Sequence, residues 1–384
     1  MKTSKAALRI CLIAPEIFPL FNPLSRAPYS DADIVMYELV QRLAESAACE
    51  VSVITGNYGQ ELVEYHAGAL VYRVDFDAQP RWWNWWKSKP DSLPEVLKQT
   101  GAEVFVMAGA NALSLPVAQF CKAKRRALVY LLMHPRDCDG TFVHGRGEEG
   151  ASYRKALHMA HSLVAPTREM ARMLQRTEGL KATVLPPFMS GYGGENSNPQ
   201  DIIWVAEVTD WTQPEYFCRL AVTLPQASFT IFGRPRKPEY LERVVERTRD
   251  IPNLGFQNSV PYGEMDAFME KARLLVNTSR NEGFPPYFTR AFQRGIPVMS
   301  LNVDPDGIIE GQQVGVFAQG SEVRLAQETL ALCSYQRQWK RLSDNAQHYA
   351  RKVLSPTPLL QEYWRVFLRA AASTKGKKRN PATS

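Results

Sequence analysis

The chain has 384 residues, more than one hydrophobic core usually organises, so we expect two domains. Its 45% hydrophobic and 22% charged residues are typical of a soluble globular protein, and no stretch is long and apolar enough to cross a bilayer. The six cysteines form no C-x-x-C pair, which argues against a disulfide scaffold or structural zinc and indicates a cytoplasmic protein with reduced thiols.

The net charge of +7 is moderately basic. Part of it lies in the run KGKKR at 375–379, so we expect residues 372–384 to form a solvated, disordered basic tail. A basic surface favours anionic lipid headgroups or acidic polymers, which leaves open a peripheral contact with the inner face of a membrane. No nucleic-acid-binding motif accompanies the charge, so we expect no nucleic-acid partner.

The first half of the chain alternates short apolar runs with amphipathic stretches, the pattern of a doubly wound sheet. The predicted strands are 8–14, 49–55, 104–108 and 128–133, and the predicted helices are 33–44 and 115–122. A further strand and helix occupy 162–176, where Thr167 is a natural helix cap. The linker-like run GYGGENSNPQ, which begins at residue 191, places a domain boundary near 190.

Residues 81–89, RWWNWWKSK, concentrate half of the eight tryptophans beside cations. Indoles stack on sugar faces, and indoles next to lysine or arginine also lie well at a membrane interface. Either role suits an enzyme that works on a lipid-linked oligosaccharide, while simple aromatic packing under a loop is the alternative. The residues concerned are Trp82, Trp83, Trp85 and Trp86.

The second half is organised around residues 274–301, which read as a strand, loop, helix and strand. Pro285 and Pro286 fit a helix start, because proline lacks the amide hydrogen that a first turn leaves unpaired. Gly295 and Pro297 predict where that helix stops. Further strands are expected at 202–205 and in SFTIFG at 228–233, and further helices at 324–331, 335–353 and 358–371.

Glu282 lies in the loop before that predicted helix, at the carboxyl edge of a parallel sheet. The helix start offers unpaired N–H groups to a phosphate, and the carboxylate could accept hydrogen bonds from sugar hydroxyls. The alternative is that Glu282 is a capping or solvated carboxylate.

The run EGFPPYFTRAFQRGIPVMSLNVDPDG, which starts at Glu282, resembles the nucleotide-sugar motif of GT-B glycosyltransferases of the GT4 family, in a bacterial polysaccharide branch. The resemblance implies two Rossmann-like domains that face each other across a cleft. The acceptor domain would be 1–190, completed by the helix 358–371 that crosses back to it, and the nucleotide-sugar domain would be 191–357.

The resemblance also implies site residues. Glu282, Gly283 and Phe284 would bind the donor, and His134, Asp137 and Asp139 in HPRDCDG would face the acceptor hydroxyl. A metal site built from His134, Asp137, Asp139 and His144 is the alternative for that loop, although the family needs no metal.

The sequence departs from the family at four places. Arg290 replaces the second glutamate, which binds the ribose in the family. Ala206 and Glu207 replace a Gly-Arg pair, and Thr212 or Gln213 stands where a lysine is expected. Ser30–Asp33, SDAD, replace a glycine pair and read as a helix cap. A glutamate at position 207 would repel a diphosphate, so either other cations hold the diphosphate or the donor is not held at all. The candidate cations are Arg234, Arg236, Lys237 and Arg290.

The resemblance implies a retaining, metal-independent glycosyltransferase. It would take a nucleoside diphosphate sugar as co-substrate, use no cofactor, and act on a polysaccharide or lipid-linked oligosaccharide acceptor. The alternative is a catalytically silent GT-B protein that serves as partner or scaffold of an active transferase. Decay of a donor site would remove the family's arginine, lysine, glycine pair and second glutamate together, as is seen here. An epimerase of the same fold that acts on a nucleotide sugar is a third possibility.

Overall fold

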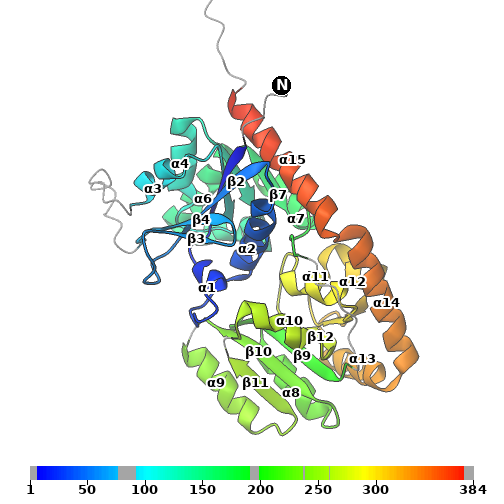
Figure 1. Ribbon diagram of the computed structural model, residues 1–384. Helices are drawn as coiled ribbons and strands as arrows, with labels where there is room; N and C mark the ends of the chain where they lie inside the picture. The colour runs from blue at the N-terminus through cyan, green and yellow to red at the C-terminus, as the bar shows by residue number, and fades with distance from the viewer. Residues whose placement is uncertain (1–6, 77–91, 191–198, 237, 259, 376–384) are drawn as a thin grey trace, which may run out of the picture. The chain divides into compact units, whose positions relative to one another are not determined.

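The computed structural model describes residues 7–76, 92–190, 199–236, 238–258 and 260–375, which form two compact α/β units (Figure 1). Of these residues, 7–21, 32–186 and 357–375 belong to the first unit, and 22–31 and 187–356 belong to the second. The short segment Asn22–Asp31 is therefore part of the second unit, although its neighbours in sequence belong to the first.

The first unit is built on an eight-stranded sheet with the order β3-β4-β2-β1-β5-β6-β7-β8. Its neighbouring strands pair in parallel, apart from β3, which is antiparallel to β4. The strand order changes direction at β1, which pairs with β2 on one side and β5 on the other. The strands are β1 (Leu8–Ile13), β2 (Cys49–Thr55), β3 (Val63–His66), β4 (Ala69–Arg73), β5 (Val104–Ala108), β6 (Ala127–Leu131), β7 (Ser162–Ala165) and β8 (Thr183–Val184).

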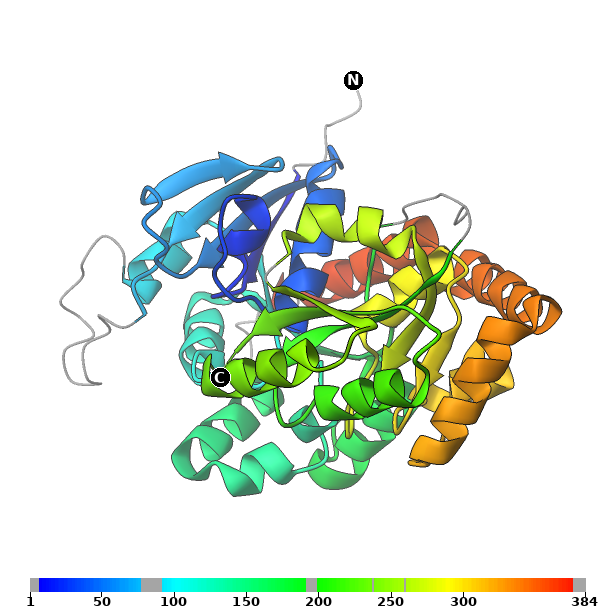
Figure 2. The same cartoon turned by 90° about the horizontal axis from the view of Figure 1, so that it is seen from below.

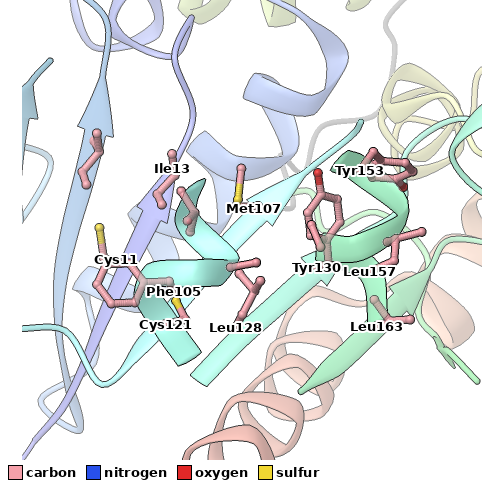
Figure 3. Packing of buried hydrophobic residues seen from close by; sticks show 14 of the residues in the cluster. Cys11, Ile13, Phe105, Met107, Cys121, Leu128, Tyr130, Tyr153, Leu157 and Leu163 are labelled. Carbon is pink, nitrogen blue, oxygen red and sulfur yellow. The ribbon is translucent and has the colours of Figure 1, made fainter. Parts of the chain in front are cut away.

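The helices of the first unit cover a core of buried side chains. Figure 3 shows Phe105 and Met107 of β5 and Tyr130 of β6 packed with Cys121 of α4 and Tyr153 of α6. The helices are α1 (Phe18–Phe21), α2 (Asp31–Ala44, whose first residue belongs to the second unit), α3 (Leu93–Gln99), α4 (Ser114–Lys124), α5 (Thr141–Gly145), α6 (Gly147–Met159) and α7 (Arg168–Glu178), with a 3-10 turn at Pro135–Asp137.

The hairpin β3–β4 forms one edge of the first sheet (light blue in Figure 2) and was not foreseen from the sequence. Its two loop residues, Ala67 and Gly68, both have positive φ, 47° and 82°. Their neighbours His66 and Ala69 are paired, so the loop is the two-residue turn whose twist matches a hairpin.

The second unit is built on a six-stranded parallel sheet with the order β11-β10-β9-β12-β13-β14. The strands are β9 (Asp201–Val208), β10 (Phe229–Pro235), β11 (Leu254–Asn258), β12 (Ala272–Asn277), β13 (Val298–Ser300) and β14 (Gly315–Phe317). The helices are α8 (Pro214–Thr223), α9 (Pro238–Arg249), α10 (Met265–Met269), α11 (Pro286–Gln293), α12 (Ile308–Gly311), α13 (Glu322–Ser334) and α14 (Gln336–Val353), with 3-10 turns at Tyr262–Glu264 and Pro305–Gly307. Two parallel-sheet α/β domains were predicted from the sequence, and the structure confirms them.

The last helix, α15 (Pro356–Lys375), returns to the first unit, as the sequence predicted. Its buried Tyr363 donates a hydrogen bond of 3.1 Å to the carbonyl oxygen of Pro186. Within the described part of the chain, no helix is long and apolar enough to span a membrane.

Gly295 fixes the packing of α11 against α14. Its backbone has a φ of +69°, which residues with a side chain rarely adopt. A Cβ added at this position would lie 2.8 Å from Ser343 Oγ and 2.9 Å from Gln347 Cγ. We expect Gly295→Ala to lower the free energy of unfolding by about 2–3 kcal/mol, combining backbone strain with overpacking. Urea unfolding measures the effect.

Gly179 provides a matched control for this prediction. It also has a φ of +69°, but nothing lies within 4 Å of its added Cβ. Gly179→Ala should therefore lower the free energy of unfolding by about 1 kcal/mol, the strain alone. Equal effects at the two positions would contradict the claim that α11 and α14 are in tight contact at Gly295.

Candidate functional site

The carboxyl ends of three neighbouring strands bring polar residues together in the second unit. The sheet order changes direction at β9, which pairs with β10 on one side and β12 on the other. Such a switch point is where parallel α/β sheets bind ligands. Glu207 lies at the end of β9, Arg234 at the end of β10, and the loop with Glu282 follows β12.

Glu282 lies in a loop that is held firmly at both sides. Trp211 Nε1 donates to the carbonyl oxygen of Asn281 at 2.7 Å, and the amide of Arg280 donates to the carbonyl oxygen of Trp211 at 3.0 Å. Below the loop, Trp204 Nε1 donates to Thr278 Oγ1 at 2.9 Å. A carboxylate on such a loop keeps a fixed position for a ligand.

The Glu282 carboxyl is mostly buried, and burial together with the negative charge of Asp31 raises its pKa to about 7. The pKa is lowered in part by hydrogen bonds with the side chains of Ser279 and Asn277 and by the charge of Arg234. A shifted carboxyl at a sheet switch point is typical of a functional site rather than of a solvated surface group.

Arg234 is the buried cation of this site, with 4% of its surface exposed. Its Nη2 donates to Asp31 Oδ1, from the segment Asn22–Asp31 of the second unit. Its guanidinium carbon lies 5.3 Å from the ring centre of Tyr29 and 5.5 Å from that of Tyr287. Its Nε and Nη1 are buried and make no hydrogen bond within the described part of the chain.

Arg290 is engaged elsewhere in the unit. Its Nη1 lies 3.1 Å from Asp266 Oδ1, and its Nη2 donates to the Tyr262 hydroxyl at 2.6 Å. Arg294 adds a second contact with Asp266, at 3.4 Å. These bonds tie α11 to the segment before β12, so they give Arg290 an anchoring role. Donor binding by Arg290 stays a prediction.

The negative charge of Glu207 is offset by a neighbouring arginine. Glu207 Oε2 lies 3.6 Å from Arg236 Nε, so the two charges offset each other. The repulsion that the sequence suggested between Glu207 and a diphosphate is thereby reduced. Arg236, like Arg234, therefore has an acidic partner, and Lys237 lies outside the described residues.

Gly283 and Phe284 are buried at the start of α11, as their place before Pro285 implied. No side chain caps this helix start: residue Pro285 precedes it and Pro286 is its first residue. Pro285 and Pro286 carry no N–H, and the amide of Phe288 donates to the carbonyl oxygen of Pro285 at 3.0 Å. The start of α11 therefore offers a ligand fewer amide donors than the sequence predicted.

In the first unit, Asp137 ties together the ends of β5 and β6. Its Oδ2 accepts hydrogen bonds from the amides of Met133 at 2.8 Å and His134 at 2.9 Å, and its Oδ1 accepts one from Ala110 at 3.3 Å. The Tyr153 hydroxyl donates to its carbonyl oxygen at 2.9 Å. Because Asp137 is buried and its carboxylate binds backbone amides, the geometry favours a positioning role for it.

His134 is held by the same turn. Its Nδ1 accepts a hydrogen bond from the amide of Arg136 at 3.2 Å. A neutral imidazole whose Nδ1 accepts a hydrogen bond carries its proton on Nε2. Asp139 accepts a hydrogen bond from the amide of Thr141 at 2.8 Å and one from its hydroxyl at 2.6 Å, which is an Asx-turn directly before α5.

Two further predictions were the tryptophan cluster and the alternative metal site. Trp82, Trp83, Trp85 and Trp86 lie outside the described residues. Within the described residues, no group of three or more His, Cys, Asp or Glu side chains is arranged to hold a metal ion.

Sequence reasoning missed the aromatic and acidic partners of the cations. Tyr287 stands inside the run that resembles the family motif, so its position was available as a signal. Asp31 was read as a helix cap, and Tyr29, Tyr262 and Asp266 carried no signal, because their partners are 24 or more residues away in sequence.

Family models of glycosyltransferases match the sequence in both units. The model described as "Glycosyl transferase 4-like domain" matches residues 32–187, and the model described as "Glycosyl transferases group 1" matches residues 199–334. A search of curated proteins finds no match.

Solved structures share the fold at low sequence identity. Sucrose-phosphate synthase from Thermosynechococcus elongatus is 12% identical with a TM-score of 0.71, over 95% of this chain and 100% of that one. Anabaena HepE, solved in complex with UDP and glucose, is 13% identical with a TM-score of 0.69, over 94% and 99%. UDP-GlcNAc 2-epimerase from Neisseria meningitidis, bound to UDP-GlcNAc, is 13% identical with a TM-score of 0.59, over 94% and 100%.

The fold class predicted from the sequence is confirmed by these structures. The two family-model matches, one in each unit, together with the shared fold, support a GT-B glycosyltransferase.

Proposed function

We propose that the protein transfers a glycosyl group from a nucleoside diphosphate sugar to a hydroxyl group of a polysaccharide or lipid-linked oligosaccharide, with retention of configuration and without a metal ion. The observation that carries the proposal is that Glu282 and Arg234 lie together at the switch point of the second sheet, close enough for the charge of Arg234 to lower the pKa of Glu282. A carboxyl that accepts from sugar hydroxyls and a buried guanidinium that binds phosphate are the two groups such a donor requires.

In this proposal the second unit binds the donor. Glu282 accepts hydrogen bonds from the donor sugar, and Arg234 binds the diphosphate through donors that have no partner within the described residues. The start of α11, next to Gly283 and Phe284, favours the phosphates through the partial positive charge of the helix end. HepE has been solved with UDP and glucose, which supports a donor of this class.

The first unit orients the acceptor. His134 donates its Nε2–H to an oxygen of the substrate, while Asp137 fixes the turn that holds His134. Asp139, on the same turn, is the remaining polar group available to the acceptor.

The reaction breaks the bond between the anomeric carbon and the β-phosphate oxygen and forms a bond between that carbon and the acceptor oxygen. The acceptor hydroxyl releases its proton to solvent, and the nucleoside diphosphate leaves with an added negative charge. Arg234 stabilises that charge most strongly as it develops, because the guanidinium is desolvated before the reaction starts.

The silent-scaffold alternative predicts a decayed donor site, and the contacts around Glu282 and Arg234 do not favour it. An epimerase shares the fold and binds a nucleotide sugar, so donor binding alone does not separate the two activities. Transfer to an acceptor separates them, since an epimerase returns the sugar to its nucleotide.

Calorimetric titration with UDP-, GDP-, ADP- and dTDP-sugars tests the proposal. We expect one of them to bind with micromolar affinity, about 8 kcal/mol. Glu282→Gln should weaken that binding by about tenfold or more, because a neutral amide replaces a charge-assisted acceptor.

The exposed Glu246 on α9 provides the matched control. Glu246→Gln removes the same charge from the same unit and should leave the affinity unchanged. If no sugar nucleotide binds the unmodified protein, the transferase proposal is wrong. If binding occurs, release of nucleoside diphosphate in the presence of candidate acceptors reports transfer.

A further inference from the structure

The segment Asn22–Asp31 brings two side chains to the donor site that no strand of the second sheet supplies. Tyr29 is 7% exposed, and its ring meets that of Tyr262 edge to face with centres 6.4 Å apart. Asp31 lies two residues further on and binds Arg234. The segment thus fills part of the space around the buried guanidinium.

Arg234 is surrounded by polar atoms that lack partners. Its Nε and Nη1 and the hydroxyls of Tyr29 and Tyr287 are all buried, and none makes a hydrogen bond within the described part of the chain. Both tyrosine side chains and Arg234 are more than nine-tenths buried. Buried polar groups normally have partners, so these atoms indicate a ligand that accepts several hydrogen bonds.

The chemistry of that ligand follows from the donors. Burial raises the pKa of Tyr29 and Tyr287 above the ordinary phenol value, so both hydroxyls stay protonated and can donate. A guanidinium with two phenol donors beside it suits an anion with several oxygens, and a phosphate group fits this description.

Asp31 already offers Arg234 an anionic oxygen. Its side chain is 37% exposed, so it reaches a buried cation from a partly solvated position. Carboxylates and phosphates bind guanidinium groups through the same fork of donors. The Asp31 carboxylate therefore takes up a donor of Arg234 that a phosphate would otherwise bind.

We propose that Asp31 is an internal competitor that occupies Arg234 in the unliganded protein, and that the diphosphate of the donor displaces it and binds Arg234 together with the hydroxyls of Tyr29 and Tyr287. This inference rests on the proposed function and adds to it the residues that bind the diphosphate. The competing explanation is that Asp31 holds Arg234 in the orientation that binds phosphate. The two explanations predict opposite effects when the carboxylate is removed.

Calorimetric titration with inorganic pyrophosphate distinguishes the two explanations of the role of Asp31. Asp31→Asn keeps the size of the side chain and its suitability for a helix start, but removes the charge. We expect it to bind pyrophosphate at least fivefold more tightly than the unmodified protein. Asp31→Ala should behave in the same way, which protects the test against a folding defect of one variant.

The exposed Asp250 provides the control for net charge. Asp250→Asn removes one negative charge from the surface of the second unit and should change the affinity less than twofold. Adding Arg234→Gln to Asp31→Asn should abolish the gain, and adding Tyr287→Phe should reduce it severalfold. Circular dichroism shows that each variant is folded.

Unchanged or weaker pyrophosphate binding by both Asp31 variants overturns the inference, as does a gain of equal size in Asp250→Asn. The outcome is separate from the fate of the proposed function. If Asp31→Asn gains pyrophosphate affinity while no sugar nucleotide binds, the anion site stands and the transferase proposal fails. If sugar nucleotides bind but the Asp31 variants bind pyrophosphate less well, Asp31 positions Arg234 and does not compete.

Discussion

Glu282→Gln is expected to stabilise the protein at pH 8 by about 3 kcal/mol and to have almost no effect near pH 4.5. The pKa of the Glu282 carboxyl is about 7 in the folded protein, against an ordinary value of 4.5. At a pH between 4.5 and 7, the Glu282 carboxyl is mostly protonated in the folded protein and mostly ionised in the unfolded chain. The free energy of unfolding therefore falls as the pH rises from 4.5 to 7, and glutamine removes that decline.

Urea unfolding at a series of pH values measures this effect as the difference between the variant and the unmodified protein. Glu246→Gln, which removes an exposed carboxylate from the same unit, is the control variant. Since the charge of Asp31 contributes to the shift, Asp31→Asn should move the midpoint of the decline to lower pH. A difference that does not grow between pH 5 and pH 8 would mean that Glu282 titrates as an ordinary surface carboxyl.

The expected decline of stability with rising pH bears on the function of Glu282. A carboxylate that destabilises the folded protein when it ionises is retained where its charge serves a ligand. Above pH 7 Glu282 is a full acceptor for sugar hydroxyls, while below pH 7 it is increasingly protonated. Donor affinity is accordingly expected to rise with pH over the same interval in which stability falls.

The fold could be predicted because its signals are local. Apolar runs marked the strands β1, β2, β5 and β6 to within two residues, and two prolines and a glycine marked the ends of α11. The β3–β4 hairpin was missed because its turn, Ala67–Gly68, lacks the Asn-Gly or Asp-Gly pair that usually announces a two-residue loop.

The candidate site could be predicted in part. Glu282 was found from its place between a strand and a proline-initiated helix. The partners of the cations could not be found, because an ion pair such as Arg234 with Asp31 joins residues 203 positions apart and leaves no periodic trace. The assignment of Asn22–Asp31 to the second unit had no signal either, since hydrophobic patterning tells which residues are buried but not against which unit.

Asp137→Ala is expected to lower the free energy of unfolding by about 3–5 kcal/mol, because three backbone amides lose a buried charged acceptor. Asp137→Asn should lower it by nearly as much, since the amide's NH₂ group would face backbone N–H groups. Asp139→Asn is the comparison within the same turn. Within the described residues its carboxylate accepts hydrogen bonds from Thr141 only, so a loss of about 1 kcal/mol is expected, the usual value for a side-chain hydrogen bond.

Urea unfolding of the three variants separates positioning from chemistry. The sequence placed Asp137 among the groups that face the acceptor, and a group with that role can be replaced by asparagine without unfolding the turn. A large loss of stability in both Asp137 variants, with a small loss in Asp139→Asn, would show that Asp137 serves the acceptor through the position of His134. A stable Asp137→Asn variant would contradict this and would return Asp137 to the list of reacting groups.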